Sequence, residues 1–365
     1  MLRRRLLAAP VVVTLLAAAA CVPGPGGGHG AVGSDQAPPP LSEVTPLDDP
    51  RGWEGPVHAG LGGVEIRPVT DDAAPQLPVT LTDAQGTEVT VTEVDRILAL
   101  DIYGTLSQTV FELGLGESLV GRDVSTQFDE ARDLPLVTSN GHELNAESIL
   151  ALDPTLIITD TSLGPWDVVL QMRDAGIPVV VVDSTRSLEN IATITSQVAA
   201  ALGVPDLGVK LSDRIMAETQ AVIDEIAAVA PSPPAEQLRT VFLYVRGQAG
   251  VYYMFGEGSG ADDLIASLGL YDVTAEIGWS GMKPVNDEGV IAAQPELIIM
   301  MTKGLDSVDG VDGLLDRLPA LANTPAGQSR RIVDMDDSQV LSFGPRTPDV
   351  LNSLAVSIYA PEALT

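Results

Sequence analysis

The stretch that decides the fold class is NAESILALDPTLIITD, which spans residues 145–160. Asn145 belongs to the residue types that cap helix N-termini, and the apolar residues after it recur at helical spacing. TLIIT, at 155–159, is a short apolar and β-branched run, as expected of a strand. A short helix followed at once by such a strand predicts an α/β unit.

The same alternation continues on both sides of this stretch. Before it, the patterns predict a strand, a helix and a short strand at 97–100, 105–115 and 119–121. After it, residues 165–176 predict a helix with Pro165 in its first turn and a glycine at its end. PVVVV, at 178–182, is typical of a parallel strand buried on both faces. We therefore place a first α/β lobe at 77–204, opened by a hairpin around the sequence DAQG.

A long helix separates this lobe from a second one. A helical pattern runs from Asp206 to Ala230 and stops at PSPP, so we place an interlobe helix at 205–231. A further set of strand and helix patterns predicts a second lobe at 237–362; these patterns lie at 239–246, 261–270, 288–294, 296–301, 314–318, 330–335 and 347–359. The expected fold is α/β, with two Rossmann-like lobes joined by a single long helix and the ligand in the interlobe cleft.

The N-terminus has the features of a secretion signal. Arg3, Arg4 and Arg5 precede an apolar run that ends at Ala20 and is too short to span a bilayer. Cys21 follows this run directly, and its context resembles a bacterial lipobox, in which the cysteine is acylated. We expect residues 1–20 to be a lipoprotein signal peptide and lipidated Cys21 to anchor an extracytoplasmic protein to the membrane.

Residues 21–76 are rich in Pro, Gly and Asp and show no sustained period. They are expected to form a flexible linker and irregular extension.

Charge excludes one class of partner. The chain has 20 basic and 50 acidic residues, a formal net charge of −30. Such a surface repels phosphate backbones, so nucleic acid is not expected to bind. Cys21 is the only cysteine, so no disulfide can form within the chain.

In its order of predicted elements and in several motifs, the chain resembles the periplasmic-binding-protein lobes of ABC importers for haem, cobalamin and iron–siderophores. FELGLGESLVGRD (111–123) and NAESILALDPTLIITD carry the general likeness, which covers residues 77–362. More selective is the similarity to actinobacterial haem-binding lipoproteins of haemin importers. It rests on 133–165, FLYVRG (242–247), GSGADDLIASLG (258–269) and FGPRTPDVL (343–351). This resemblance implies an α/β substrate-binding protein that delivers haem to a permease and its ATPase.

The resemblance further implies that haem iron is bound by His142 from the first lobe and Tyr244 from the second, with Arg246 beside the tyrosine. His142 is the only histidine in the predicted lobes, and it lies in a turn-forming SNGH context before a helix. Tyr244 and Arg246 are two residues apart on a predicted strand, so their side chains leave the same face. A free phenol is a poor ligand at neutral pH, but a nearby guanidinium and a ferric ion both favour the phenolate. Tyrosine is an established axial ligand of haem iron.

Other candidates for the cleft carry weaker signals. Residues 252–255 (YYMF) can either cover a porphyrin face or form the core side of a strand. Trp279 and Met282 lie in a predicted loop that could close over a ligand. Arg346 can either pair with a haem propionate or be an exposed arginine near the C-terminus.

The resemblance also implies one exposed acid on each lobe for docking onto the permease. Glu147 matches the position in the first lobe. In the second lobe the choice stays open among Glu257, Asp262 and Asp263.

Three alternative functions remain, of which one is a sensor lobe that passes its occupancy to a receptor. A binding protein for an iron–siderophore or cobalamin would have the same lobes without needing a His–Tyr pair. An extracytoplasmic α/β enzyme is less favoured, because the sequence has no nucleophile elbow, no HExxH and no P-loop. We therefore expect no enzymatic activity.

Overall fold

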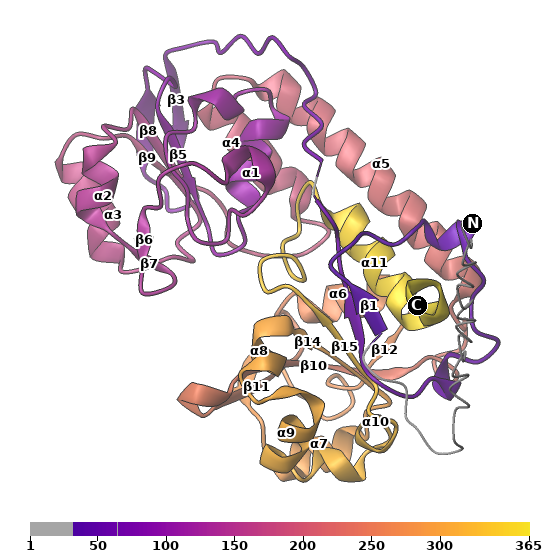
Figure 1. Cartoon of the computed structure of the whole chain (residues 1–365). Coiled ribbons are helices and arrows are strands. Elements are labelled where there is room, and N and C mark those ends of the chain that lie inside the picture. The colour runs from indigo at the N-terminus through magenta and orange to yellow at the C-terminus, as the bar shows by residue number, and fades with distance from the viewer. Residues whose placement is uncertain (1–31, 64) are drawn as a thin grey trace, which may run out of the picture.

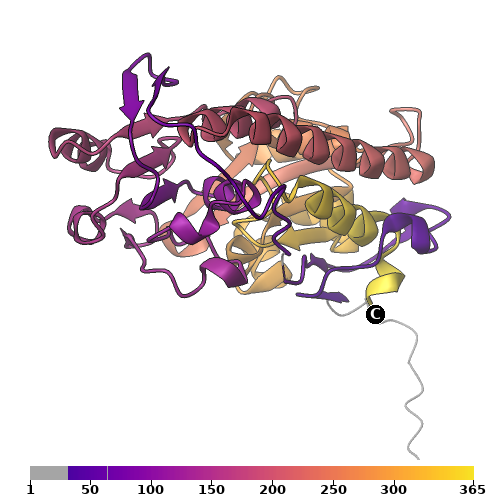
Figure 2. The same ribbon diagram turned by 90° about the horizontal axis from the view of Figure 1, so that it is seen from above.

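The computed structural model describes residues 32–63 and 65–365. It shows two α/β lobes, and helix α5 (Pro205–Val229) runs along both of them (Figures 1 and 2). The predicted fold class and the long helix at the lobe junction are confirmed. No helix in the described part of the chain is long and apolar enough to cross a membrane.

The N-terminal lobe is built on a parallel sheet in the order β5-β8-β9. Its strands are β5 (Ile97–Leu100), β8 (Leu156–Thr159) and β9 (Val179–Val181), and all their residues are buried. The helices of this lobe are α1 (Thr105–Glu112), α2 (Ala146–Ala151), α3 (Trp166–Asp174) and α4 (Ile191–Ala201). The expected hairpin is formed by β3 (Val79–Thr82) and β4 (Glu88–Val91). Residues 119–121, expected as a strand, form an isolated bridge from Leu119 to Ile97.

The C-terminal lobe is built on a mixed eight-stranded sheet that begins with β1 (Val32–Ser34) and β2 (Val57–Ala59). The strand order is β1-β2-β15-β14-β10-β11-β13, with β12 (Tyr271–Asp272) beside β10. Strands β10 (Arg239–Arg246), β14 (Leu297–Met301) and β15 (Ile332–Met335) are parallel. Strands β11 (Val251–Phe255) and β13 (Met282–Pro284) continue the sheet in antiparallel pairing.

The two faces of this sheet are covered by different helices. Helices α6 (Ala261–Ser267) and α11 (Thr347–Tyr359) pack with α5 on one face. The other face is covered by α7 (Asp287–Ala293), α8 (Thr302–Asp306), α9 (Gly310–Arg317) and α10 (Pro325–Ser329). The sheet is therefore buried on both faces, as its apolar strands predict.

Residues 32–76 were expected to belong to a flexible linker and irregular extension, and most of the described ones have no regular structure, but part of the segment is ordered and belongs to the C-terminal lobe. Strand β1 (Val32–Ser34) pairs with β2 (Val57–Ala59), and β2 pairs with β15, so this segment extends the sheet of the C-terminal lobe. Leu41 and Trp53 are 1% and 5% exposed. For this part the prediction failed because two three-residue strands among glycines and prolines show no period, and their partner lies far along the chain. The signal peptide and Cys21 lie outside the described residues.

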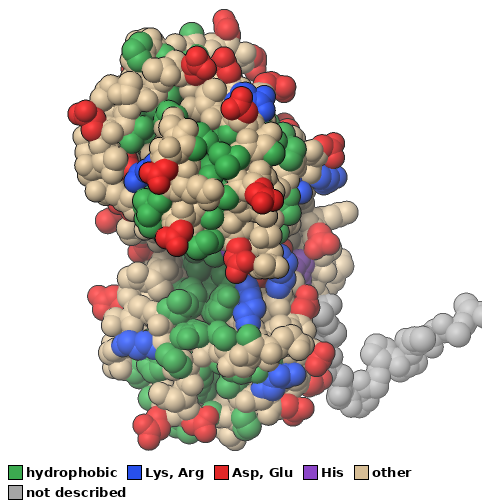
Figure 3. Space-filling view, turned by 90° about the vertical axis from the view of Figure 1, so that its left-hand side faces the viewer, with side chains coloured by type: hydrophobic (Ala, Val, Ile, Leu, Met, Phe, Trp, Pro, Cys, Tyr) green, Lys and Arg blue, Asp and Glu red, His purple; other side chains and the backbone are tan. Residues whose placement is uncertain are grey.

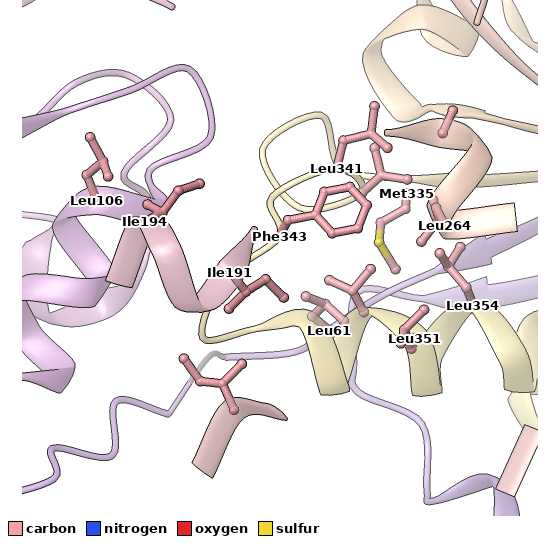
Figure 4. Packing of buried hydrophobic residues seen from close by; sticks show 14 of the residues in the cluster. Leu61, Leu106, Ile191, Ile194, Leu264, Met335, Leu341, Phe343, Leu351 and Leu354 are labelled. Atoms are coloured by element: carbon pink, nitrogen blue, oxygen red, sulfur yellow. The ribbon is translucent and has the colours of Figure 1, made fainter. Parts of the chain in front are cut away.

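The two lobes share one apolar cluster. Figure 4 shows Ile191 and Ile194 of α4 on the side of the N-terminal lobe, and Leu264, Leu351 and Leu354 on the other side. Phe343 and Leu341, from the segment that leads from β15 to α11, lie between them, and Leu61 of the extension joins from below. This continuous packing fixes how the lobes approach each other, and so positions the cleft.

Candidate functional site

His142 is presented by a tight hairpin of the N-terminal lobe. Strands β6 (Thr138–Ser139) and β7 (Glu143–Leu144) pair, and Asn140 and Gly141 turn the chain with φ of 47° and 90°. Such left-handed angles suit asparagine and glycine, which explains the SNG sequence before His142. The Asn145 side chain accepts a hydrogen bond from the Ser148 N–H at 2.9 Å, so the predicted N-cap is confirmed. The hairpin holds His142 at an exposed position beside the start of α2.

Tyr244 and Arg246 lie on β10, where both half-buried side chains alternate with those of the fully buried Leu243 and Val245. The Tyr244 ring stacks on Phe255 with centroids 6.0 Å apart. The Arg246 guanidinium lies over the Tyr244 ring, 4.4 Å from its centroid. The predicted common face of these two residues is therefore confirmed.

Asp337 fixes the Arg246 guanidinium in this position. Its carboxylate accepts a bond from Arg246 Nη2 at 2.5 Å and another from the Lys303 backbone N–H at 3.0 Å. Arg246 Nη1 donates to the Val245 carbonyl at 2.8 Å. The bonds of Arg246 within the described structure thus go to Asp337 and the backbone, while its charge acts on Tyr244 through the ring face. Sequence reasoning missed Asp337, which lies 91 residues from Arg246.

Electrostatics link His142 to the opposite lobe. Partial desolvation lowers the pKa of His142, and the positive charges of Lys303 and Arg246 lower it further, while Asp337 opposes them. These three charges belong to the C-terminal lobe, so the fold brings His142 towards the Tyr244–Arg246 pair. A lowered pKa keeps the imidazole neutral, which is the form that ligates a metal.

The N-terminal lobe contains a buried ionic cluster around Arg186. Arg186 pairs with Asp101 at 3.1 Å and with Asp160, and its guanidinium lies 5.3 Å from the centroid of the Tyr103 ring. Burial raises the pKa of Tyr103, Arg186 opposes this rise, and the Tyr244 phenol adds slightly to it. Burial also raises the pKa of Asp101 to about 6, although Arg186 opposes this. Sequence reasoning missed the cluster, whose only signal was an aspartate directly after each of the strands β5 and β8.

The weaker candidates divide between the cleft and the core. Met254 and Phe255 are core residues, 1% and 9% exposed, whereas Tyr252 and Tyr253 are half-buried. The Trp279 indole donates to the Met254 carbonyl at 2.8 Å, and Met282 is 56% exposed on β13. Figure 3 shows hydrophobic side chains gathered along the hollowed junction between the lobes, flanked by charged ones.

Arg346 contradicts the alternative of an exposed arginine, because it is 3% exposed. It lies at the start of α11, beneath the junction of the two lobes.

The candidate docking acids differ in their exposure and in the hydrogen bonds that their carboxylates accept. Glu147 is exposed in the first turn of α2, and Glu257 is exposed after β11. The Asp262 carboxylate accepts bonds from the N–H groups of Gly258 and Gly260, and Asp263 accepts one from Leu188. Asp262 and Asp263 therefore have hydrogen-bonding partners in the described structure.

The comparisons with known proteins agree with this architecture. Residues 102–339 match the periplasmic binding protein family. The uncharacterized ABC transporter substrate-binding lipoprotein YvrC of Bacillus subtilis (strain 168) is 25% identical over 288 residues, which cover 77% of this chain and 86% of that protein.

Solved structures of heme-binding proteins are more similar. The heme binding protein HmuT is 41% identical with a TM-score of 0.80, covering 86% of this chain and 99% of that one. Variants of HmuT in which an arginine, a histidine or a tyrosine is replaced by alanine match as well, with TM-scores of 0.82, 0.80 and 0.81. The periplasmic heme-binding protein RhuT from Roseiflexus sp. RS-1 is 36% identical with a TM-score of 0.66, covering 75% of this chain and all of that one.

The match to the family spans more than half of the chain, and the two-lobed fold agrees with it. This chain belongs to the periplasmic binding protein family, as an extracytoplasmic substrate-binding protein of an ABC importer of the haem, cobalamin and siderophore type.

Proposed function

We propose that this protein binds ferric haem between its lobes and delivers it to the permease of an ABC importer, with His142 and Tyr244 as the two axial ligands. The observation that carries the proposal is the placement of His142. The β6–β7 hairpin holds it within the electrostatic reach of Arg246 and Lys303, on the lobe that carries Tyr244. Each lobe then contributes one ligand to the same iron.

The chemistry of the two residues suits ferric iron. A phenolate is a hard anionic oxygen that stabilises Fe(III) over Fe(II), which favours carriage over electron transfer. A neutral imidazole completes the axial pair. Arg246 places its positive charge over the Tyr244 ring, and Asp337 pairs with the same guanidinium. The likeness to the heme-binding proteins HmuT and RhuT supports the same cargo.

Lipid anchoring and docking complete the proposal. Cys21 would tether the protein to the membrane, as the lipoprotein name of YvrC supports. Glu147 and Glu257 would meet basic residues of the permease, because both are exposed acids and they lie on different lobes.

A spectrum after haemin addition separates haem from the alternative cargoes. A haem complex shows a Soret band, whereas a siderophore complex does not. His142→Ala should leave a phenolate-ligated ferric haem that is five-coordinate or bound to water, while Tyr244→Ala should ease reduction of the iron.

Two phenylalanine variants give a matched test of the tyrosine. Tyr253 lies directly opposite Tyr244 on β11. Tyr244→Phe should remove the phenolate charge-transfer features, and Tyr253→Phe, which loses the same atom, should keep them. If His142→Ala/Tyr244→Ala retained the wild-type Soret position and affinity, the iron would be ligated elsewhere and the siderophore hypothesis would become the better one.

A further inference from the structure

A cavity of about 520 Å³, lined mostly by residues with polar side chains, lies apart from the His142–Tyr244 pair. Three parts of the chain contribute most of its lining: the N-terminal extension, the N-terminal lobe around the short helix Asp129–Ala131, and the segment that leads from β15 to α11. Thr302 of α8 completes it. His142, Tyr244 and Arg246 are not among its lining residues. The cavity is therefore a separate feature at the junction of the two lobes.

Arg346 lines this cavity and is 3% exposed. Its Nε donates to Gln108 Oε1 at 2.7 Å, and its guanidinium lies 5.8 Å from the centroid of the Phe128 ring. Among the described residues, Nη2 has no hydrogen-bond acceptor and no carboxylate lies within ion-pair distance. A buried guanidinium that keeps its charge without a counter-ion is energetically costly.

The other arginines that are buried to this extent, Arg186 and Arg331, also have donor atoms without an acceptor in the described structure, but they differ from Arg346 in their partners and position. Arg186 has two carboxylate partners, Asp101 and Asp160. Arg331, which does not line the cavity, donates to the carbonyls of Trp53 and Ile358 at 3.3 and 3.0 Å. Arg346 thus combines burial, an unsatisfied donor and a position at a cavity, and these together indicate an anionic ligand.

The acids of the cavity are already engaged. Asp129 pairs with Arg132, and Asp35 pairs with His58 at 3.2 Å. Asp336 accepts bonds from the N–H and hydroxyl of Ser338 at 2.9 and 2.6 Å. Burial lowers the pKa of the Arg346 guanidinium, and the charge of Asp336, which does not form an ion pair with it, opposes this shift. Because these acids are already paired or lie close to Arg346, the cavity suits a ligand with a single negative charge better than a doubly charged phosphate.

We propose that this cavity is a carboxylate-binding site in which Arg346 receives one carboxylate group. A guanidinium matches the planar geometry of a carboxylate through two parallel hydrogen bonds. The carboxylate comes either from a free small organic acid or from a propionate of the cargo, and the second source rests on the proposed function.

The first arm of the experiment uses the ligand-free protein and sodium propionate. Thermal unfolding is followed in propionate, chloride and phosphate at equal ionic strength. Propionate should raise Tm above the value in chloride for the wild type and for Arg132→Gln, a cavity-lining cation that is already paired. The increment should vanish in Arg346→Gln.

The second arm compares haemin with its dimethyl ester, in which both propionates are neutral. If a propionate of the cargo occupies the site, the ester should bind roughly tenfold more weakly to the wild type, as expected for a charge-assisted hydrogen bond. Haemin and its dimethyl ester should bind equally well to Arg346→Gln.

The wild-type measurements decide the proposal even if Arg346→Gln does not fold. A Tm increment in propionate with equal binding of haemin and ester supports a free acid as the source. Weaker binding of the ester without a Tm increment supports a propionate of the cargo as the source of the carboxylate. The absence of both effects overturns the proposal, whereas a Tm increment without any haemin binding overturns the proposed function and leaves this site intact.

Discussion

Replacing Leu41 by alanine tests whether the extension belongs to the folded core. Leu41 is 1% exposed in the main apolar cluster, and its N–H donates to Asn352 Oδ1 of α11 at 2.8 Å. Six residues later, the Leu47 N–H donates to the carbonyl of Tyr359, also on α11, at 2.7 Å. The segment is therefore held by packing and by backbone hydrogen bonds.

The expected cost of Leu41→Ala is about 3 kcal/mol of unfolding free energy, since Leu→Ala changes in cores cost roughly 2–5 kcal/mol. The fully buried position places this site well inside that range. A flexible linker would give no cost. Leu170→Ala is the matched control, because Leu170 is 43% exposed on α3. It should change the free energy by no more than about 0.5 kcal/mol.

Urea unfolding of the soluble protein, followed by circular dichroism, measures both variants. The two lobes need not unfold in one transition, so the midpoint of the transition that reports the C-terminal lobe is the relevant quantity. Equal midpoints for Leu41→Ala and Leu170→Ala would refute the assignment of the extension to the core.

Three further predictions concern the anchor, docking and pH. Cys21→Ala should abolish acylation and release the protein from the membrane fraction; retention there would contradict the lipid anchor. Glu147→Lys should impair uptake by the assembled importer and leave haemin affinity unchanged, whereas normal uptake would make Glu147 an ordinary helix-start residue. Hydrogen bonding to Asp334, with the charge of Asp35, raises the pKa of His58. The stabilisation from His58 is therefore full below the unfolded-state pKa and lost as pH rises, so His58→Gln should cost more stability at pH 6 than at pH 8 by urea titration.

The periodic parts of the fold were predictable from the sequence because their patterns are local. The cap at Asn145 and the β-branched run at 178–182 specify an element without reference to distant residues. The strand register that places Tyr244 and Arg246 on one face follows from the same period-2 rule. Such features depend on neighbours a few positions apart.

What the sequence did not reveal depends on pairing between distant segments. Residues 57–59 form strand β2 because they pair with β15, and these three residues alone do not predict that pairing. Arg186 meets Asp160 and Asp101 only after three strand ends converge at one edge of the sheet. The burial of Arg346 follows from the packing of both lobes and the extension around the start of α11, so an exposed position was equally compatible with the sequence.

Asp337 provides the last prediction, because it acts on the haem site through Arg246. The Arg246–Asp337 pair is partly buried, with side chains 30% and 14% exposed, so its net contribution is modest, on the order of 0.5–1 kcal/mol. Asp337→Asn should therefore weaken haemin binding about two- to fivefold and shift the phenolate charge-transfer band, since the guanidinium is no longer held over the Tyr244 ring. In an Arg246→Ala background the same substitution should change neither quantity, because the residue through which Asp337 acts is gone. A loss of affinity that persisted in that background would show that Asp337 supports the lobe in general, through its bond to the Lys303 N–H, rather than positioning Arg246.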